Sequence, residues 1–106
     1  RFDLMPRPSR PVGEIQQTIV FGESFKKLAP AIKEEGIERE KWFRNNINDE
    51  RLKPHMVNKN ERLYSFRISK HSPVYVIIYY FSKIVKGRVV FIFAGEEKEA
   101  YRRHSL

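Results

Sequence analysis

The stretch from Leu63 to Ala94 constrains the fold of this chain more than any other segment. It holds three runs dense in Val, Ile, Tyr and Phe, separated by a His-Ser-Pro segment and a Lys-Ile-Val-Lys-Gly segment. β-Branched and aromatic residues bounded by turn formers are typical of β-strands. The middle run, Val74 to Phe81, is apolar at odd and even positions alike, which indicates a strand covered on both faces. We therefore predict a three-stranded antiparallel meander with this run at its centre.

The net charge of the chain is concentrated on the same stretch and its approach. Nine Lys and Arg residues face a single acid between residues 51 and 92, and this excess equals the formal net charge of +8. Residues 1–50 and 93–106 each hold equal numbers of acids and bases. A basic surface of this kind is suited to binding a polyanion.

Length and composition restrict the class of protein. A chain of 106 residues has room for one small domain. It has no cysteine, and its longest apolar run is far shorter than the roughly 20 residues that span a bilayer. No secretory signal pattern opens the sequence, so we expect a soluble, cytoplasmic protein without a membrane partner. The three histidines lack zinc-ligand spacing and there is no glycine-rich phosphate loop, so we expect no metal and no cofactor.

The chain divides into residues 1–13 and a single domain over residues 14–106. The first segment contains three prolines and three arginines without a hydrophobic period, which predicts an extended arm. A mobile tail is the favoured interpretation. A basic arm that lies on nucleic acid, or on the protein's own sheet, is the alternative.

Two helices are expected between the arm and the meander. Residues 15–21 predict an edge strand that ends at Gly22, and a helix follows from Glu23. Pro30 interrupts that helix, which implies either a kink or two short helices. Gly36 then marks the helix end, and a second helix is expected over about residues 37–46.

The second helix is expected to bury Trp42, Phe43 and Ile47. Residues 48–61 are polar and predict a loop, and Gly95 is expected to end the last strand before a short helix or turn. The predicted fold class is α+β. An N-terminal strand and a helical hairpin pack on a mainly antiparallel sheet whose C-terminal part is the meander.

Three phrases of the second half resemble the RelE/ParE superfamily of toxins from toxin-antitoxin pairs. They are Leu63-Tyr64-Ser65-Phe66-Arg67-Ile68, Tyr75-Val76-Ile77-Ile78-Tyr79 and Gly95-Glu96-Glu97-Lys98-Glu99-Ala100-Tyr101. With the element order, the likeness covers roughly residues 15–103. The resemblance implies a RelE-like fold and a cognate antitoxin. In the RelE branch it also implies cleavage of mRNA at the ribosome without a metal, and hence inhibition of translation.

Such cleavage uses the 2′-hydroxyl of the RNA as the nucleophile, so it needs a base, cations at the phosphate and an acid. By resemblance, Arg67 and Tyr101 match residues that the family uses for catalysis. Ser65, Val76 and the pair Glu96 and Glu97 stand where the family has basic residues. These departures remove most of the expected cations.

His71 and Glu97 are candidate substitutes. His71, in the turn before Pro73, is the side chain suited to proton transfer near neutral pH, and Glu97 is a candidate base. Each has a simpler structural interpretation, as an exposed hairpin loop and as a favourable residue at a helix start. Tyr101 could equally be a packing residue. We expect Arg67, Lys70, His71 and Tyr101 to meet on an accessible concave side of the meander, with the helix pair behind it.

The predicted RNA-binding residues are the cations around this side: Arg51, Lys53, Lys59, Arg62, Lys70, Lys98, Arg102 and Arg103. The leading hypothesis is a RelE-like endoribonuclease. Two alternatives stay open, a ParE-like toxin that binds DNA gyrase and a non-catalytic RNA-binding protein. The latter would show a steep salt dependence of RNA affinity.

Overall fold

The computed structural model describes residues 11–69 and 71–105. In chain order its elements are β1 (Glu14–Gln17), α1 (Ile19–Lys26), α2 (Pro30–Asn45), the 3₁₀ helix η2 (Glu50–Leu52), β2 (His55–Asn58), β3 (Leu63–Arg67), β4 (Tyr75–Phe81), β5 (Arg88–Glu96) and α3 (Glu97–His104). The strands form one sheet in the order β1-β5-β4-β3-β2. The β1–β5 pair is parallel, and the other neighbouring strands are antiparallel. The fold class is α+β, as predicted; the sheet has five strands, one more than expected, and is mixed.

The predicted meander is present, and β4 is the middle strand of the whole sheet. Its residues Val76 to Tyr79 are all buried. Ile77 and Tyr79 pack in the larger hydrophobic cluster, whereas Val76 and Ile78 pack in a second cluster. Because successive side chains of a strand point to opposite faces, both faces of β4 are covered.

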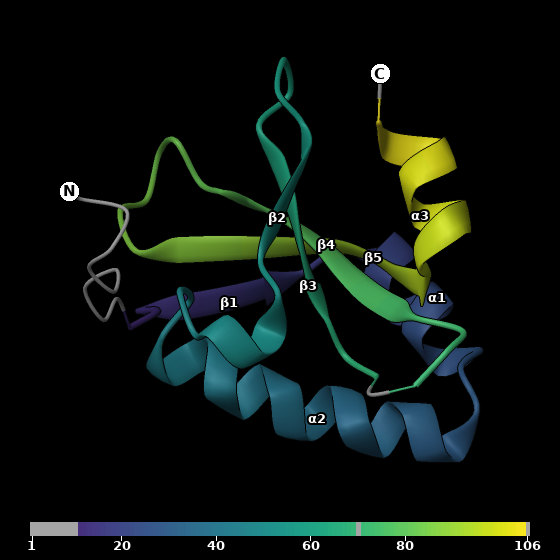
Figure 1. Ribbon diagram of the computed structural model, residues 1–106. Coiled ribbons are helices and arrows are strands. Elements are labelled where there is room, and N and C mark those ends of the chain that lie inside the picture. The colour runs from purple at the N-terminus through teal and green to yellow at the C-terminus, as the bar shows by residue number, and fades with distance from the viewer. Residues whose placement is uncertain (1–10, 70, 106) are drawn as a thin grey trace, which may run out of the picture.

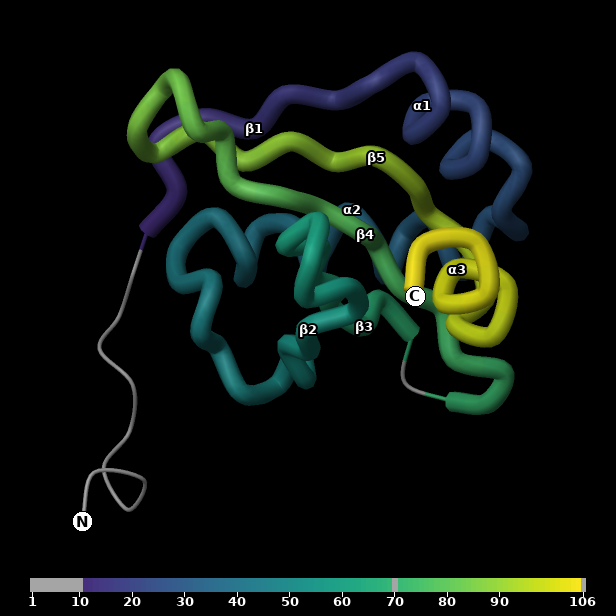
Figure 2. Tube along the Cα trace, turned by 90° about the horizontal axis from the view of Figure 1, so that it is seen from above, coloured from purple at the N-terminus to yellow at the C-terminus, as the bar shows by residue number. Residues whose placement is uncertain are grey.

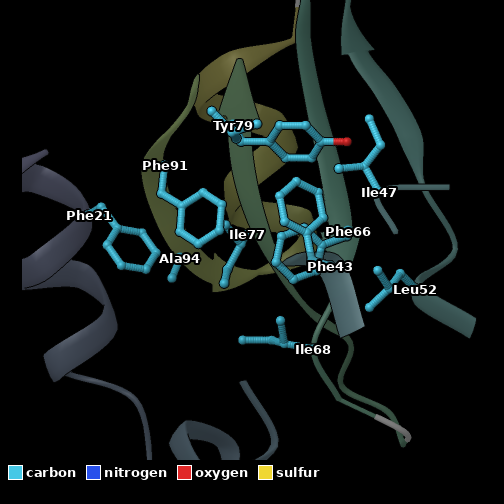
Figure 3. Close-up of a cluster of buried hydrophobic side chains, with 11 residues drawn as sticks. Phe21, Phe43, Ile47, Leu52, Phe66, Ile68, Ile77, Tyr79, Phe91 and Ala94 are labelled. Atoms are coloured by element: carbon cyan, nitrogen blue, oxygen red, sulfur yellow. The ribbon is translucent and has the colours of Figure 1, made fainter. Parts of the chain in front are cut away.

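Helices α1 and α2 cover one face of the sheet, as Figure 1 shows. The larger cluster lies between them and the strands, with Phe43 of α2 at its centre (Figure 3). The Phe43 ring centroid lies 4.6 Å from that of Phe66, 4.9 Å from Tyr79 and 5.7 Å from Phe91. Burying one such ring stabilises a fold by about 1.5–3 kcal/mol. The helix pair therefore lies against the sheet, as predicted.

The first strand is shorter than predicted. It ends at Gln17, and the apolar run that begins at Ile19 belongs to α1. Thr18 favours a helix start here, because its side chain accepts a hydrogen bond from the Phe21 backbone N–H (3.1 Å) and caps the helix. The predicted strand end at Gly22 is wrong, since Gly22 lies inside α1. The predicted edge position of the strand is confirmed.

The helix boundaries between residues 23 and 46 also differ from the prediction. Pro30 is the first residue of α2, where its missing N–H costs nothing, so it separates two helices. The predicted helix end at Gly36 is wrong, because α2 continues to Asn45. A Cβ on Gly36 would lie 3.0 Å from Cε1 of Phe25 and 3.4 Å from Cδ1 of Ile68. The glycine thus allows α2 to approach both α1 and the chain just after β3.

Two further predictions need correction. Residues 48–61 are not simply a loop, since they contain η2 and β2. Strand β5 continues through Gly95 to Glu96, and the predicted short helix, α3, follows directly. A Cβ on Gly95 would lie 2.8 Å from Cε2 of Phe93, so any other residue at this position would force the Phe93 ring to shift. Of the predicted buried residues, Phe43 and Ile47 are buried and Trp42 is half-buried.

Residues 1–10 of the predicted arm lie outside the described residues. The last part of the arm is attached to the domain: the Val12 N–H donates to the Arg44 carbonyl (2.9 Å) and the Gly13 N–H to the Gly87 carbonyl (3.0 Å). Within residues 11–69 and 71–105, no helix is long and apolar enough to cross a membrane.

Candidate functional site

The face of the sheet opposite α1 and α2 carries the candidate site. Along β3, Phe66 packs in the cluster under the helices, whereas Leu63 packs in the second cluster. The alternation of a strand places Ser65 and Arg67 on the same face as Leu63. Helix α3 covers only part of this face, as Figure 2 shows, and its Ala100 is buried there. Alternation therefore places Arg67 on the sheet face opposite the larger cluster, as the expected arrangement requires.

A hollow of about 360 Å³ lies beside α3 on this face, and we call it the tyrosine hollow. Its lining comes from the η2–β2 junction, from β2, β3 and β4, and from the first turns of α3. The lining residues are Lys53, Pro54, His55, Ser65, Arg67, Val76, Glu97 and Tyr101.

The strand register brings these residues together. His55 of β2 is paired with Ser65 of β3, and Arg67 of β3 with Val76 of β4. Helix α3 starts directly after β5, and the Glu97 N–H donates to the Val74 carbonyl (2.8 Å), which holds the helix start against β4. Glu97 and Tyr101 are four residues apart on one helix face, so both side chains reach the hollow.

Tyr101 is held by contacts on two neighbouring strands. Its hydroxyl lies 3.2 Å from Oγ of Ser65, within hydrogen-bond distance, and its ring stacks on His55 with centroids 5.7 Å apart and planes 18° apart. Burial raises the pKa of Tyr101 above its usual 10.0, and the negative charge of Glu97 adds to this. The hydrogen bond with Ser65 and the charge of Arg67 act in the opposite direction. The phenol therefore keeps its proton at neutral pH and is a donor in the hollow.

Arg67 and Lys53 give the hollow its positive charge. The ion pairs of the described residues do not include either side chain. The Nε of Arg67 is buried and has no hydrogen-bond partner among the described residues. The Nε of Arg88 is buried without a partner as well, so this feature alone does not mark a site; Arg67 is singled out because its side chain also lines the hollow.

The structure brings only part of the predicted set together. Arg67, Glu97, Tyr101 and Lys53 line the tyrosine hollow. His71 is exposed in the β3–β4 loop and does not line it, and Lys70 lies outside the described residues. Arg51 lines a different hollow.

The remaining predicted cations lie elsewhere on the surface. Lys59 and Arg62 are exposed in the β2–β3 turn, and Lys98 is exposed on α3. Arg103 and Arg102 form ion pairs with Glu99, at 3.2 and 4.0 Å. None of these five side chains lines the tyrosine hollow.

Among the family departures, Ser65 and Val76 face the tyrosine hollow, as does Glu97. Ser65 holds the Tyr101 hydroxyl where the resemblance expects a cation. Lys53, which lies between η2 and β2, adds a cation to the lining beside Ser65 and Val76.

Sequence reasoning missed His55 as a site residue. It is the first residue of β2, and residues 48–61 read as a polar loop, so nothing placed it beside Tyr101. The available signal is the apolar pair Met56 and Val57 between Pro54 and Asn58, which is too short to distinguish a strand from a turn.

Comparison with known proteins finds no matching family model, no matching curated protein and no matching solved structure. Among the described residues there is also no group of three or more His, Cys, Asp or Glu side chains placed to hold a metal ion.

Proposed function

We propose that this protein is a RelE-like toxin that cleaves messenger RNA on the ribosome as a metal-independent endoribonuclease. The observation that carries the proposal is that Arg67 and Tyr101, the two residues that match the family phrases, line one hollow together with Lys53 and Glu97. The order of one strand, two helices and a C-terminal meander supports the same proposal.

The proposed reaction is an internal transesterification of RNA. The 2′ oxygen attacks the adjacent phosphorus, and the bond from phosphorus to the 5′ oxygen of the next nucleotide breaks. The products are a 2′,3′-cyclic phosphate and a free 5′-hydroxyl. One proton leaves the 2′-hydroxyl and one proton reaches the departing oxygen, so the step needs a base and an acid and no further reactant.

The residues of the tyrosine hollow fit these roles. Among the residues that the structure describes, Glu97 is the only carboxylate that lines the hollow, and it takes the proton from the 2′-hydroxyl. Tyr101 is protonated at neutral pH, burial raises its pKa further above the ordinary 10.0, and its phenol gives the proton to the 5′ oxygen. Arg67 and Lys53 stabilise the charge that develops on the phosphoryl oxygens. His55 stacks on the Tyr101 ring and orients it.

The direct test is to incubate the protein with translating ribosomes and map the ends of the cut message. We expect cuts that carry 2′,3′-cyclic phosphates. Lys53→Gln should lower the cleavage rate about 10-fold or more, since one cation at the phosphate is lost. Lys86→Gln is the matched control, because Lys86 lies next to the opposite end of the β4–β5 ladder, where Phe81 pairs with Val89. Its rate should stay close to that of the wild type.

Two outcomes would overturn the proposal. Inhibition of DNA supercoiling by gyrase without any RNA cleavage would assign the chain to the ParE branch. RNA binding that weakens steeply with salt, again without cleavage, would indicate a non-catalytic RNA-binding protein. A toxin of either branch implies an antitoxin, whose acidic, amphipathic segment would complement the basic surface of this domain.

A further inference from the structure

A second hollow adjoins the tyrosine hollow and shares Lys53 and Arg67 with it. Its volume is about 300 Å³, and we call it the tryptophan hollow. Its lining residues are Arg39, Trp42, Arg51, Lys53, Arg67 and Ser69. Four of these six residues are cations and none is an acid, so the hollow presents positive charge to a ligand.

Arg51 is held in place at this hollow by several contacts. Its Nε and one terminal nitrogen donate to the two carboxylate oxygens of Asp49, at 3.0 and 2.7 Å. The same hydrogen bonding lowers the pKa of Asp49, so the pair stays charged at neutral pH. The Arg51 guanidinium carbon also lies 3.8 Å from the centre of the Trp42 ring. A guanidinium fixed in this way binds an anion with little loss of conformational entropy.

Arg39 is positioned in a similar manner from inside α2. Its side chain is nearly buried and forms ion pairs with Glu35 and Glu38. Its guanidinium carbon lies 4.3 Å from the centre of the Trp42 ring. Two guanidinium groups already lie over Trp42, so the ring is a support for charge here and not a free stacking surface for a base.

Lys53 and Arg67 connect the two hollows. Asp49 balances Arg51, and Glu35 and Glu38 balance Arg39, so Lys53 and Arg67 supply the excess positive charge. Ser69 contributes little to a ligand, because its hydroxyl already accepts from the Tyr75 N–H (2.8 Å). A ligand with two neighbouring negative charges would engage both hollows through the shared cations. Single-stranded RNA carries one such charge at every nucleotide.

We propose that the tryptophan hollow binds the phosphate that neighbours the scissile phosphate of single-stranded RNA. Lys53 and Arg67 contact both phosphates, and Arg51 contacts only the neighbouring one. This inference rests on the proposed function for the identity of the scissile phosphate. Its test, however, measures binding alone and does not require cleavage.

The test uses a short RNA with a single 2′-deoxynucleotide at the cleaved position, so that the probe is not cut. A series of probes carries one neutral methylphosphonate at each linkage in turn. We expect Arg51→Gln to weaken binding of the unmodified probe about 5-fold, since one charge-assisted contact is lost. With one particular modified linkage the variant and the wild type should bind equally, because the contact is already absent. Such a loss of additivity identifies a direct contact between Arg51 and the phosphate of that linkage.

Two controls complete the design. Arg51→Lys keeps the charge but not the paired geometry, so its loss of affinity should be smaller than that of Arg51→Gln while depending on the same linkage. Lys86→Gln should show no linkage dependence. An Arg51→Gln effect that is equal for all modified probes, or absent for all, would overturn the inference. If the wild type never cleaves RNA but the linkage-specific effect is present, the nuclease proposal fails and the phosphate site stands.

Discussion

The two faces of this sheet are built from the same strands, yet they differ in how completely they are covered. Helices α1 and α2, of 8 and 16 residues, cover one face and bury a cluster of aromatic rings. The other face has a single helix of 8 residues, α3, which buries a smaller cluster. The tyrosine hollow lies beside α3 on the part of this second face that the helix leaves uncovered.

Strand β3 shows the difference within five residues. Tyr64 and Phe66 face the helix layer, whereas Ser65 and Arg67 face the hollow. On the helix face a polar side chain would lose its hydrogen bonds to water, so packing determines the residues. On the face that carries α3, the Arg67 side chain lines a hollow and is accessible to a ligand. The comparison shows that stability and candidate function are separated by the alternation of one strand.

The largest predicted effect concerns the helix face. Phe43→Ala should lower the free energy of unfolding by about 3–5 kcal/mol, because the Phe43 ring is fully buried among three other rings. Phe93→Ala, in the smaller cluster beside α3, should have a smaller effect. Urea titrations of both variants measure the two losses in the free energy of unfolding. Equal losses would show that the two faces contribute alike to stability.

The next effect concerns activity at the hollow. Arg67→Gln should reduce the rate of RNA cleavage about 100-fold, because it removes a cation that stabilises the phosphoryl oxygens. The urea midpoint should change little, since Arg67 forms no ion pair among the described residues. Single-turnover kinetics measure the cleavage rate. Lys86→Gln is the control, because it also removes one positive charge. A rate like that of the wild type would remove Arg67 from the site.

A third prediction uses alkaline pH. The pKa of Tyr101 is raised in the folded protein, mainly by burial, so the folded state holds the phenolic proton more tightly than the unfolded chain. The stabilising contribution is complete below the ordinary tyrosine value of 10.0 and is lost as the pH rises through the folded pKa. Between pH 8 and 11, the free energy of unfolding should therefore decline more steeply with pH for the wild type than for Tyr101→Phe. Parallel curves would contradict the buried placement of this phenol.

The smallest effect is the coupling between Ser65 and Tyr101. Removing both hydroxyls should destabilise the protein less than the sum of the single changes, with a coupling energy of about 1 kcal/mol. The cycle compares Ser65→Ala, Tyr101→Phe and the double variant by urea unfolding. Strict additivity would mean that the 3.2 Å contact between their hydroxyls contributes nothing to stability.

The sequence was sufficient to predict the elements whose pattern is local. The β-branched and aromatic run of β4 indicated a central strand, because only a strand with two covered faces accepts apolar residues at every position. The run at Ile19 had the same composition but became a helix, since Thr18 caps it. Gly36 resembled a helix end, and the true reason for a glycine there is its contact with Phe25 and Ile68, which are distant in sequence.

The candidate site was predictable where a family phrase or the excess of basic residues marked it, as at Glu97 and Lys53. Arg67 and Tyr101 match the family phrases, and both line the tyrosine hollow. His55 and Trp42 could not be assigned, because their places beside Tyr101 and beneath two guanidinium groups depend on tertiary packing. His71 was a candidate because histidine transfers protons near neutral pH. It lies in the β3–β4 loop, outside the hollow.

The parallel pairing of β1 with β5 also bears on how the domain folds during synthesis. Glu14 lies beside Arg88, so the first strand of the sheet has no partner until some seventy more residues have left the ribosome. Contacts this far apart in sequence slow the search for the native state. Until β5 emerges, the apolar strand β4 is an open edge, which is a template for wrong strand pairing. A nascent chain of this protein therefore has its greatest need of protection late in translation, just before its last strand becomes available.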